Sequence, residues 1–321
     1  MKAYKVAIPQ DITPAGKNYL IERGYELVIG SGDTSPEAMK SLVCDADAIL
    51  ARTAPYPKEI LQEAKQLKVI GRHGIGVDNI DVEYCSAHGI WVTYAPTSNA
   101  VSVAEHTLGF MLSLAHHFPY FDKAVREGEW NVRNIRKGID LEKKKVGIIG
   151  LGRIGRLVAR KCREGMDMEV LGYDVMLQPD SYPDGIMPSS IEEIFKTADF
   201  ITLHVPSTSE TRGMVNEQLL EKMKPTACLI NCGRGDLIDE AALYQALKNK
   251  KIAGAALDVF AEEPPKKNNP LFELDNIVLT PHSAALTQES MDRMGLHAAM
   301  GIHSVLTGEV PEWSLNHPVS V

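Results

Sequence analysis

Short runs of hydrophobic, mostly β-branched residues recur along the chain, each followed by a segment with helical spacing. Strands that alternate with helical segments of about 10–15 residues are typical of βαβ units, which build parallel sheets. The pattern therefore predicts an α/β protein. The first series of predicted strands comprises Val6–Pro9, Tyr25–Ile29, Ala48–Ala51, Val69–Gly71 and Ile90–Tyr94. The second series comprises Lys145–Ile149, Glu169–Tyr173, Phe200–Val205, Ala227–Asn231, Ala253–Leu257 and Ile277–Thr280.

The two series of strands indicate two doubly wound domains. Eleven strands are too many for one ordinary sheet, and a chain of 321 residues lies where single cores usually divide. We place the boundary at the turn cluster Thr97–Asn99, which precedes a long helical pattern over Ala100–His116. Another helical pattern, Thr287–Leu306, opens a last segment that we expect to return to the first domain. The predicted domains are residues 1–98 with 285–321, and residues 99–284.

Composition and charge argue against several classes of partner. The hydrophobic share of 44% and the charged share of 24% are ordinary for a globular protein. The 34 basic and 42 acidic residues give a net charge of −8, whereas nucleic acids and anionic membranes select basic surfaces. The longest apolar stretch, Ala100–Ala115, contains Glu105 and His106, so we interpret it as a buried helix and not as a membrane span. His106 itself is interpreted as a core or domain-interface residue, and Trp130 as a packing residue.

The cysteines and the N-terminal sequence favour a cytoplasmic location. Five cysteines are scattered along the chain without a C-x-x-C motif, as is typical of a reducing compartment. The chain starts directly with a strand pattern, Met1–Ile8, and shows no secretory signal. Cys228 and Cys232 lie in an apolar run and are interpreted as core thiols, so no metal site is expected.

A glycine motif at the start of the second series predicts a dinucleotide site. The strand Lys145–Ile149 leads into Gly150-Leu151-Gly152-Arg153-Ile154-Gly155 and then into a helical pattern, as the G-x-G-x-x-G motif requires. Gly150 permits the tight turn, Gly152 lets the backbone approach a pyrophosphate, and Gly155 lets the helix pack closely on the sheet. The N-terminus of that helix offers N–H groups and a positive dipole to the phosphates.

A carboxylate at the end of the next strand favours NAD over NADP. Asp174 follows Glu169–Tyr173, nineteen residues after Gly155. A carboxylate at that place binds the ribose hydroxyls of NAD and repels the 2′-phosphate of NADP. The residues that follow, Val175–Leu177, supply no arginine to accept that phosphate. The predicted cofactor is therefore NAD.

Three polar residues follow later strands of the same series and suit hydride transfer to a 2-oxo acid. Ligands bind beyond the carboxyl ends of parallel strands, so Arg234, Glu263 and His282 are expected to meet there. A guanidinium holds a carboxylate through two hydrogen bonds, and an imidazole protonates a developing alkoxide. A carboxylate on the far imidazole nitrogen fixes its tautomer and raises its basicity. The predicted reaction interconverts a small 2-hydroxy acid and its 2-oxo acid.

On these motifs the sequence resembles the D-2-hydroxyacid dehydrogenase family over essentially its whole length. The matching motifs include Leu203-His204-Val205-Pro206, Asn231-Cys232-Gly233-Arg234-Gly235, Asp258–Pro265 and Pro281-His282. The resemblance implies a Rossmann-type cofactor domain, a flavodoxin-like substrate domain and a homodimer formed through the cofactor domains. It also implies that Glu263, and not Glu262, is the partner of His282. The residues that it places at the cofactor are Arg153, Ile154, Asp174, His204, Pro206, Thr208, Cys232 and Asp258.

The loops of the first domain bear on which acid is the substrate. Arg52 and Arg72, with the glycine-rich turn Gly74-Ile75-Gly76, resemble the loops of D-3-phosphoglycerate dehydrogenases that lack a regulatory domain. Extra guanidinium groups beside a carboxylate-binding turn suit a second anion such as phosphate. His73 departs from the small residue usual in that group. The alternative substrates are hydroxypyruvate and glyoxylate.

Two other classes of function are less compatible with the sequence. Corepressors of the C-terminal-binding-protein type resemble this family and retain the Arg, Glu and His, so an NAD-sensing interaction protein is an alternative. Those proteins carry terminal tails for partner contacts, which are almost absent here. A Ser–His–Asp hydrolase is disfavoured because the sequence has no G-x-S-x-G motif.

Overall fold

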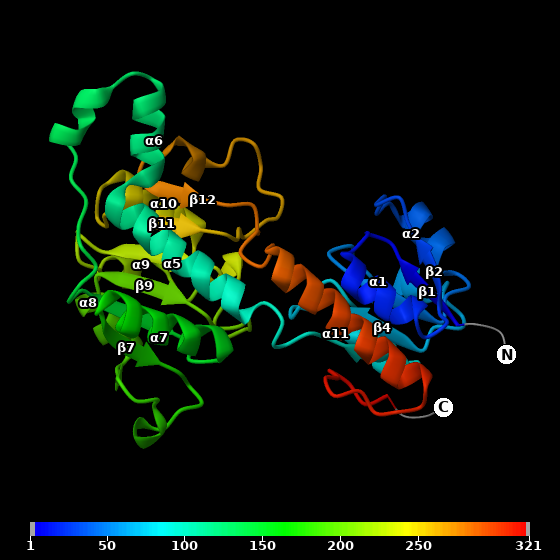
Figure 1. The fold of residues 1–321 in the computed structure, drawn as a ribbon. Helices are drawn as coiled ribbons and strands as arrows, with labels where there is room; N and C mark the ends of the chain where they lie inside the picture. Colours follow the sequence, from blue (N-terminus) through cyan, green and yellow to red (C-terminus); the bar gives the residue numbers. More distant parts are fainter. Residues whose placement is uncertain (1–3, 319–321) are drawn as a thin grey trace. The chain divides into compact units, whose positions relative to one another are not determined.

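The computed structural model describes residues 4–318, in which the chain forms two compact units (Figure 1). The first unit runs to Asn99 and resumes at Ala285, and the second is Ala100–Ala284. Each unit contains one sheet, of five and seven strands, and the paired strands of both sheets run parallel. The predicted α/β class with two doubly wound parallel sheets is confirmed.

The first unit has the strand order β2-β1-β3-β4-β5, which is the flavodoxin-like order. The helix α11 (Gln288–Leu306) begins one residue after the predicted start, because the Thr287 side chain caps it by accepting a hydrogen bond from the Ser290 N–H. It lies beside α1 (Figure 1), with Gly16 and Gly295 in such close approach that a Cβ on Gly16 would lie 2.4 Å from the Gly295 carbonyl oxygen. The other elements are β1 (Lys5–Ile8), α1 (Pro14–Ile21), β2 (Glu26–Ile29), α2 (Pro36–Val43), β3 (Ala48–Ala51), α3 (Lys58–Leu61), β4 (Val69–Arg72), α4 (Val82–Ala87) and β5 (Trp91–Thr93).

The second unit has the order β12-β11-β10-β9-β6-β7-β8, which is the Rossmann order extended by one strand. The order reverses between β6 and β9, and ligands of such sheets bind beyond the strand ends at that point. Its strands are β6 (Lys145–Ile149), β7 (Glu169–Tyr173), β8 (Ile186–Pro188), β9 (Phe200–Leu203), β10 (Cys228–Asn231), β11 (Gly254–Leu257) and β12 (Ile277–Leu279). Its helices are α5 (Ala100–His116), α6 (Phe118–Arg126), α7 (Arg153–Met166), α8 (Ile191–Thr197), α9 (Glu217–Leu220) and α10 (Glu240–Lys248), with short 3-10 turns η1 (Trp130–Asn134), η2 (Pro179–Ser181), η3 (Gly235–Leu237) and η4 (Pro270–Glu273).

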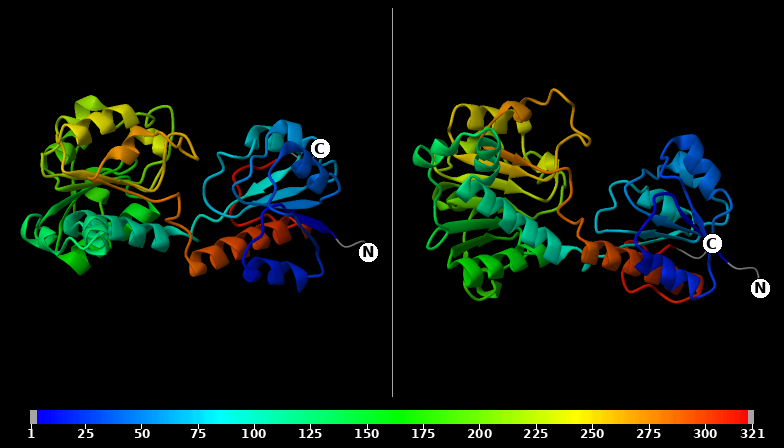
Figure 2. Two further views of the ribbon diagram at one scale, coloured as in Figure 1. Left: turned by 90° about the horizontal axis from the view of Figure 1, so that it is seen from above. Right: turned by 45° about the horizontal axis from the view of Figure 1, so that its top comes forward.

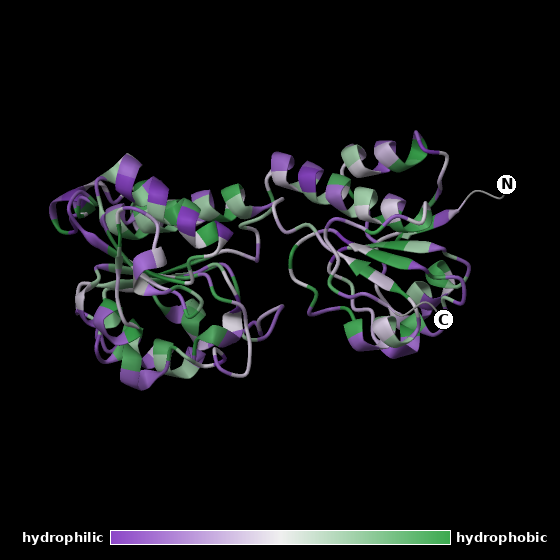
Figure 3. Cartoon of the chain, turned by 90° about the horizontal axis from the view of Figure 1, so that it is seen from below, coloured by the Kyte–Doolittle hydropathy of each residue, from purple (hydrophilic) through white to green (hydrophobic). Residues whose placement is uncertain are grey.

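Helices cover both faces of the seven-stranded sheet, as two further views show (Figure 2). Apolar residues concentrate in the strands and on the inward faces of the helices (Figure 3), and those of β6, β9 and β10 are almost wholly buried. One layer packs Ile194 and Phe195 of α8 against the sheet, both with zero exposure. Helices α5 and α7 of the same unit pack against each other. The core therefore fixes the strand ends that carry the predicted site residues.

The sequence prediction missed one strand and extended several others by one or two residues. Strand β8 pairs with β7 at the sheet edge, but only Ile186 of its three residues is buried, so it lacks the apolar run that marks a strand. The interpretation of Trp130 as a packing residue was wrong, because this side chain is 63% exposed. Within residues 4–318, no helix is long and apolar enough to span a membrane.

Candidate active site

The turn between β6 and α7 forms a backbone cradle in which each motif glycine has its own steric reason. Gly150 has φ of +97°, and a Cβ there would lie 2.6 Å from the His204 carbonyl oxygen. A Cβ on Gly155 would lie 2.0 Å from the Gly150 carbonyl oxygen, so only glycine lets α7 approach the turn. A Cβ on Gly152 would have no neighbouring atom within 4 Å, so this face of the turn is open. The cradle therefore fits a pyrophosphate at the exposed N-terminus of α7, where Arg153 and Ile154 begin the helix.

Asp174 closes the next strand end and is tied to this turn. One carboxylate oxygen accepts a hydrogen bond from the Leu151 N–H at 2.8 Å, and the other accepts one from the Met176 N–H at 2.9 Å. The side chain is half-buried, whereas Val175 and Met176 are 78% and 83% exposed. The carboxylate thus lies beside the glycine turn Gly150–Gly155, which is the place where a ribose is bound in such folds.

The loop that follows β9 carries His204, Pro206 and Thr208, three residues predicted to lie at the cofactor. Burial lowers the pKa of His204 to about 4, so the ring is neutral at pH 7, and its Nε2 lies 3.0 Å from the Thr202 hydroxyl. The Thr211 hydroxyl donates to the Pro206 carbonyl oxygen and accepts from the Thr208 N–H. Pro206 and Thr208 are at least partly exposed, so this loop presents them to solvent.

Asn231, at the end of β10, organises the loop that carries Arg234. It has zero exposure; its amide donates to the Arg234 carbonyl oxygen at 2.7 Å and its Oδ1 accepts from the Gly233 N–H at 2.9 Å. Asn231 was recognised from the sequence only as part of a motif, although a polar residue closing a buried strand is itself a signal. Burial raises the pKa of the neighbouring Cys232 thiol to about 12, so this predicted cofactor residue is an inert thiol.

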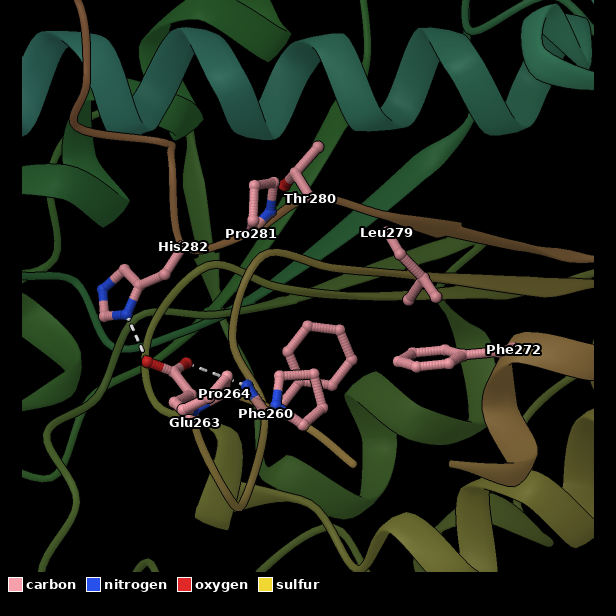
Figure 4. Close-up of a pocket in the computed structure, with 9 residues that line it drawn as sticks. Phe260, Glu263, Pro264, Phe272, Leu279, Thr280, Pro281 and His282 are labelled. Atoms are coloured by element: carbon pink, nitrogen blue, oxygen red, sulfur yellow. Dashed lines mark hydrogen bonds and ion pairs between the residues drawn. The ribbon is translucent and has the colours of Figure 1, made fainter. Parts of the chain in front are cut away.

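Glu263 and His282 form a hydrogen-bonded pair (Figure 4). The His282 Nδ1–H donates to Glu263 Oε2 at 2.7 Å, and the Phe260 N–H donates to Glu263 Oε1 at 3.0 Å. The bond to Glu263 raises the pKa of His282 above its usual value, against the effect of burial. Burial by itself would raise the pKa of Glu263, but the hydrogen bonds from His282 and Phe260 outweigh it and the pKa is lowered. The charge of Arg234 acts on both groups, so all three proposed catalytic residues lie in one electrostatic site.

The His282 ring presents its second nitrogen away from Glu263 (Figure 4), and its side chain is 52% exposed. Beside the pair lies an apolar cavity of about 360 Å³ within the second unit. Its lining residues are Phe260, Glu263, Pro264, Pro265, Phe272, Leu279, Thr280, Pro281 and His282. The ring is thus held on one side by a carboxylate and lines an apolar cavity, and its other nitrogen is not engaged by Glu263.

Asp258 holds the backbone of the loop that carries His282. Its side chain is 1% exposed, and its two oxygens accept hydrogen bonds from the Ser283 and Ala284 N–H groups at 2.8 and 2.9 Å. The His282 N–H donates to the Asp258 carbonyl oxygen at 2.8 Å. His282 has φ of +49°, a left-handed conformation that costs a residue with a Cβ roughly 1–2 kcal/mol. The sequence prediction placed Asp258 at the cofactor and did not include these bonds to the His282 loop.

The two predicted substrate loops of the first unit lie at the ends of the neighbouring strands β3 and β4. The Asn79 amide joins them by donating to the carbonyl oxygens of Arg52 and Ala54, at 3.0 and 2.6 Å. Gly74 has φ of +142°, and a Cβ there would lie 2.9 Å from the Arg72 Nη1. The glycine turn and the Arg52 segment therefore form one connected structure.

The two arginines of these loops are engaged by the protein itself. The Arg72 guanidinium donates to the carbonyl oxygens of His73 and Gly76, so it braces the turn Gly74-Ile75-Gly76 from within. Arg52 donates one N–H group to the Asp11 carbonyl oxygen at 2.7 Å. His73 is 4% exposed; burial, with the charges of Arg52 and Arg72, lowers the pKa of His73 to about 4. His73 is therefore a neutral histidine, at the position where the phosphoglycerate dehydrogenases that these loops resemble usually have a small residue.

A family model described as "D-isomer specific 2-hydroxyacid dehydrogenase, NAD binding domain" matches residues 108–284. The chain therefore belongs to the D-isomer specific 2-hydroxyacid dehydrogenase family, with its NAD-binding domain in the second unit. This confirms the resemblance that the motifs indicated.

Relatives and solved structures agree with this assignment. The chain is 43% identical over 303 residues to the D-3-phosphoglycerate dehydrogenase of Methanocaldococcus jannaschii, which covers 93% of this chain and 57% of that relative. It is 35% identical over 323 residues to the glyoxylate reductase of Korarchaeum cryptofilum, which covers 98% and 96%. A structure of Aquifex aeolicus D-lactate dehydrogenase, complexed with NAD and lactic acid, matches with a TM-score of 0.86 at 30% identity, covering 98% and 100%. The chain thus spans less than two thirds of the phosphoglycerate dehydrogenase that it matches.

The pair of Glu263 and His282 gives a first testable prediction. Glu263→Gln keeps a hydrogen-bond acceptor for the His282 Nδ1–H but removes the negative charge, so the pKa of His282 should fall. Titration of the histidine ring signals by NMR measures this directly, with His117 on another element as the internal control. A pKa of His282 that stays unchanged or rises would show that Glu263 does not set it.

Proposed function

We propose that this protein is an NAD-dependent dehydrogenase that interconverts a D-2-hydroxy acid and its 2-oxo acid. The observation that carries the proposal is the bonded pair of His282 and Glu263, within electrostatic reach of Arg234, in the NAD-binding domain of this family. A proton donor of raised pKa beside a guanidinium is the set of groups that carbonyl reduction requires.

The cofactor in this proposal is held by the strand ends of the second unit. Gly150, Gly152 and Gly155 shape the turn that receives the pyrophosphate, Arg153 and Ile154 offer the helix N-terminus, and Asp174 binds the ribose hydroxyls. The remaining residues proposed to line the cofactor site are His204, Pro206, Thr208, Cys232 and Asp258. When bound, the nicotinamide donates or accepts the hydride of the reaction.

The residues of this chain supply the acid–base chemistry. Arg234 binds the carboxylate of the substrate, and the protonated His282 donates its free N–H proton to the oxygen that develops negative charge. Glu263 keeps the proton on Nδ1 and stabilises the imidazolium. Because the pKa of His282 is raised, reduction is expected to fall as pH rises through that pKa, whereas oxidation, which needs the neutral ring, rises.

The test of the proposed reaction is NADH oxidation with glyoxylate, hydroxypyruvate, pyruvate and 3-phosphohydroxypyruvate. At least one acid should be turned over, and His282→Ala should lower kcat by about 100-fold or more, since general acid catalysis contributes about 10²–10⁴-fold. NADH binding, followed by fluorescence titration, should stay near that of the unmodified protein. Turnover that survives His282→Ala, or no turnover with any acid, would contradict the proposal.

We propose that the first unit is the substrate domain. For the substrate we propose a 2-hydroxy acid or 2-oxo acid that carries a second anionic group, such as 3-phosphoglycerate or 3-phosphohydroxypyruvate. The identity to the M. jannaschii phosphoglycerate dehydrogenase and the guanidinium group of Arg52 support this, whereas Arg72 acts by bracing the turn beside it. A guanidinium has five N–H donors, so the bond to Asp11 leaves Arg52 capacity for an anion. In this proposal the turn Gly74-Ile75-Gly76 contributes backbone N–H groups to the binding of an anionic substrate. Glyoxylate or hydroxypyruvate is the second candidate, because the glyoxylate reductase is matched over 96% of its length.

Arg52 distinguishes the two candidates. A hydrogen bond to a charged group contributes about 1.5–3 kcal/mol, so Arg52→Ala should raise KM for 3-phosphohydroxypyruvate by about 10- to 100-fold and leave hydroxypyruvate within about twofold. Arg52→Lys, which keeps the charge, is the control and should lose less. An equal loss for both acids would mean that Arg52 acts through its bond to Asp11 and not on a second anion.

We also propose a homodimer formed through the second unit. Helix α6 and the turn η1 extend from the sheet (Figure 1), and this segment exposes Phe118, Val125, Trp130 and Ile135 by 53–82%. Exposed aromatic and apolar side chains with neighbouring arginines are typical of interfaces, and Arg133 lies over the Trp130 ring. Light scattering should give twice the chain mass of 35.3 kDa, and Trp130→Glu should shift the mass towards one chain. A monomer mass for the unmodified protein would contradict the dimer.

We propose a cytoplasmic location because the cysteines are not paired in disulfides. All five are free thiols, and Cys85, Cys162, Cys228 and Cys232 are buried. Burial raises the pKa of each of these four thiols to about 12, so they are unreactive. Unpaired cysteines are typical of proteins in a reducing compartment. Disulfides found in the protein as isolated from cells would contradict this.

A further inference from the structure

His106 of α5 is hydrogen-bonded to Thr280, which contacts the Asp258 carboxylate that holds the His282 loop. The sequence predicted a core or domain-interface residue at 106, and neither role accounts for this bond. Its Nε2 lies 3.0 Å from the Thr280 hydroxyl oxygen and 3.7 Å from Asp258 Oδ1. The Thr280 hydroxyl in turn lies 2.5 Å from Asp258 Oδ1. All of these groups belong to the second unit, so one chain of contacts leads from the long helix to the loop that carries His282.

The protons in this chain can be assigned from the chemistry of the groups. A carboxylate only accepts hydrogen bonds, so the single hydroxyl proton of Thr280 goes to Asp258. The Thr280 oxygen can then only accept from His106, which places a proton on the His106 Nε2. The direction of the chain is therefore from the imidazole N–H, through the hydroxyl, to the buried carboxylate.

The end of the chain is the backbone of His282. Asp258 accepts from the Ser283 and Ala284 N–H groups, which directly follow the left-handed His282. Oδ1 is shared by Thr280 and Ser283, so the direction in which the carboxylate faces depends on Thr280 as well as on the loop. A hydrogen bond that polarises the hydroxyl strengthens the next bond in a buried chain.

We propose that His106 is a positioning residue for His282. Its Nε2–H fixes the Thr280 hydroxyl on Asp258, and Asp258 thereby holds the loop in the conformation from which His282 protonates the substrate. This rests on the proposed function only for its effect on turnover; the effect on the His282 loop stands without it.

Packing alone does not account for this histidine. The His106 ring meets Phe110 edge-on with centroids 4.5 Å apart, a contact that an apolar side chain would also make. The side chain is 23% exposed, so it is neither a wholly buried core residue nor a solvated one. What an apolar residue cannot supply is the donor to Thr280.

Two variants separate the donor from the packing. His106→Leu removes the donor and keeps an apolar side chain, and His106→Gln keeps an N–H donor at similar reach. His106→Leu should lower kcat by about tenfold with KM for NADH nearly unchanged, because small misplacements of a reacting group cost up to about 100-fold. His106→Gln should restore most of the loss. Equal losses in both variants, or none in either, would overturn the proposal.

A double-mutant cycle shows whether His106 acts through Thr280. Thr280→Val removes the hydroxyl with little change of shape, and in that background His106→Leu should have no further effect on kcat. Additive losses would overturn the proposed route. Thermal unfolding of each variant verifies that the fold is retained.

NMR keeps the test independent of turnover. The His282 ring and the Ser283 and Ala284 amide signals should shift in His106→Leu and return towards their original positions in His106→Gln. If the unmodified protein reduces none of the acids but these signals respond, the proposed function fails and the positioning role stands. If the enzyme is active and the signals do not move, the positioning role fails and the proposed function stands.

Discussion

Asp258 is buried to 1% exposure, yet its carboxylate ties together the backbone and side chains around the proposed proton donor. Burying a charge is costly unless hydrogen bonds replace its hydration, and Asp258 receives them from Thr280, Ser283 and Ala284. Two of these donors are backbone groups of the loop after β12. The stabilisation of the carboxylate and the strained conformation of His282 therefore depend on each other.

This constraint explains how an exposed histidine is held in one position. The backbone of His282 is fixed from the side of Asp258, and its ring is fixed from the side of Glu263. Glu263 is in turn fixed by the Phe260 N–H, two residues beyond Asp258 on the same segment. One short stretch after β11 thus determines both the position and the proton affinity of the ring. The cofactor turn is built differently, from glycines whose missing side chains permit close backbone contact.

The sequence was sufficient to predict an element or a site where a motif and the neighbouring strand or helix pattern lie in one short segment. Gly150–Gly155 follows a strand and opens a helix, and the helix predicted over Ala100–His116 has those bounds in the structure. Strand β8 was missed because its exposed edge residues carry no apolar pattern. The bracing of its own turn by Arg72 could not be predicted, because a long side chain can reach many acceptors. Glu105 and His106 interrupt an otherwise apolar helix, which signals that His106 has a polar partner. The sequence could not identify that partner, because Thr280 lies 174 residues away along the chain.

The central claim, that this chain transfers a hydride between NADH and a 2-oxo acid, is tested most directly by isotope transfer. NADH that carries deuterium at both C4 positions is incubated with the protein and the 2-oxo acid, and the product is examined by mass spectrometry and chiral chromatography. The account predicts a D-2-hydroxy acid with one deuterium on its second carbon, because the hydride comes from the cofactor and the oxygen-bound proton from His282 exchanges with water. A product without deuterium, one of the L configuration, or no product at all would contradict it.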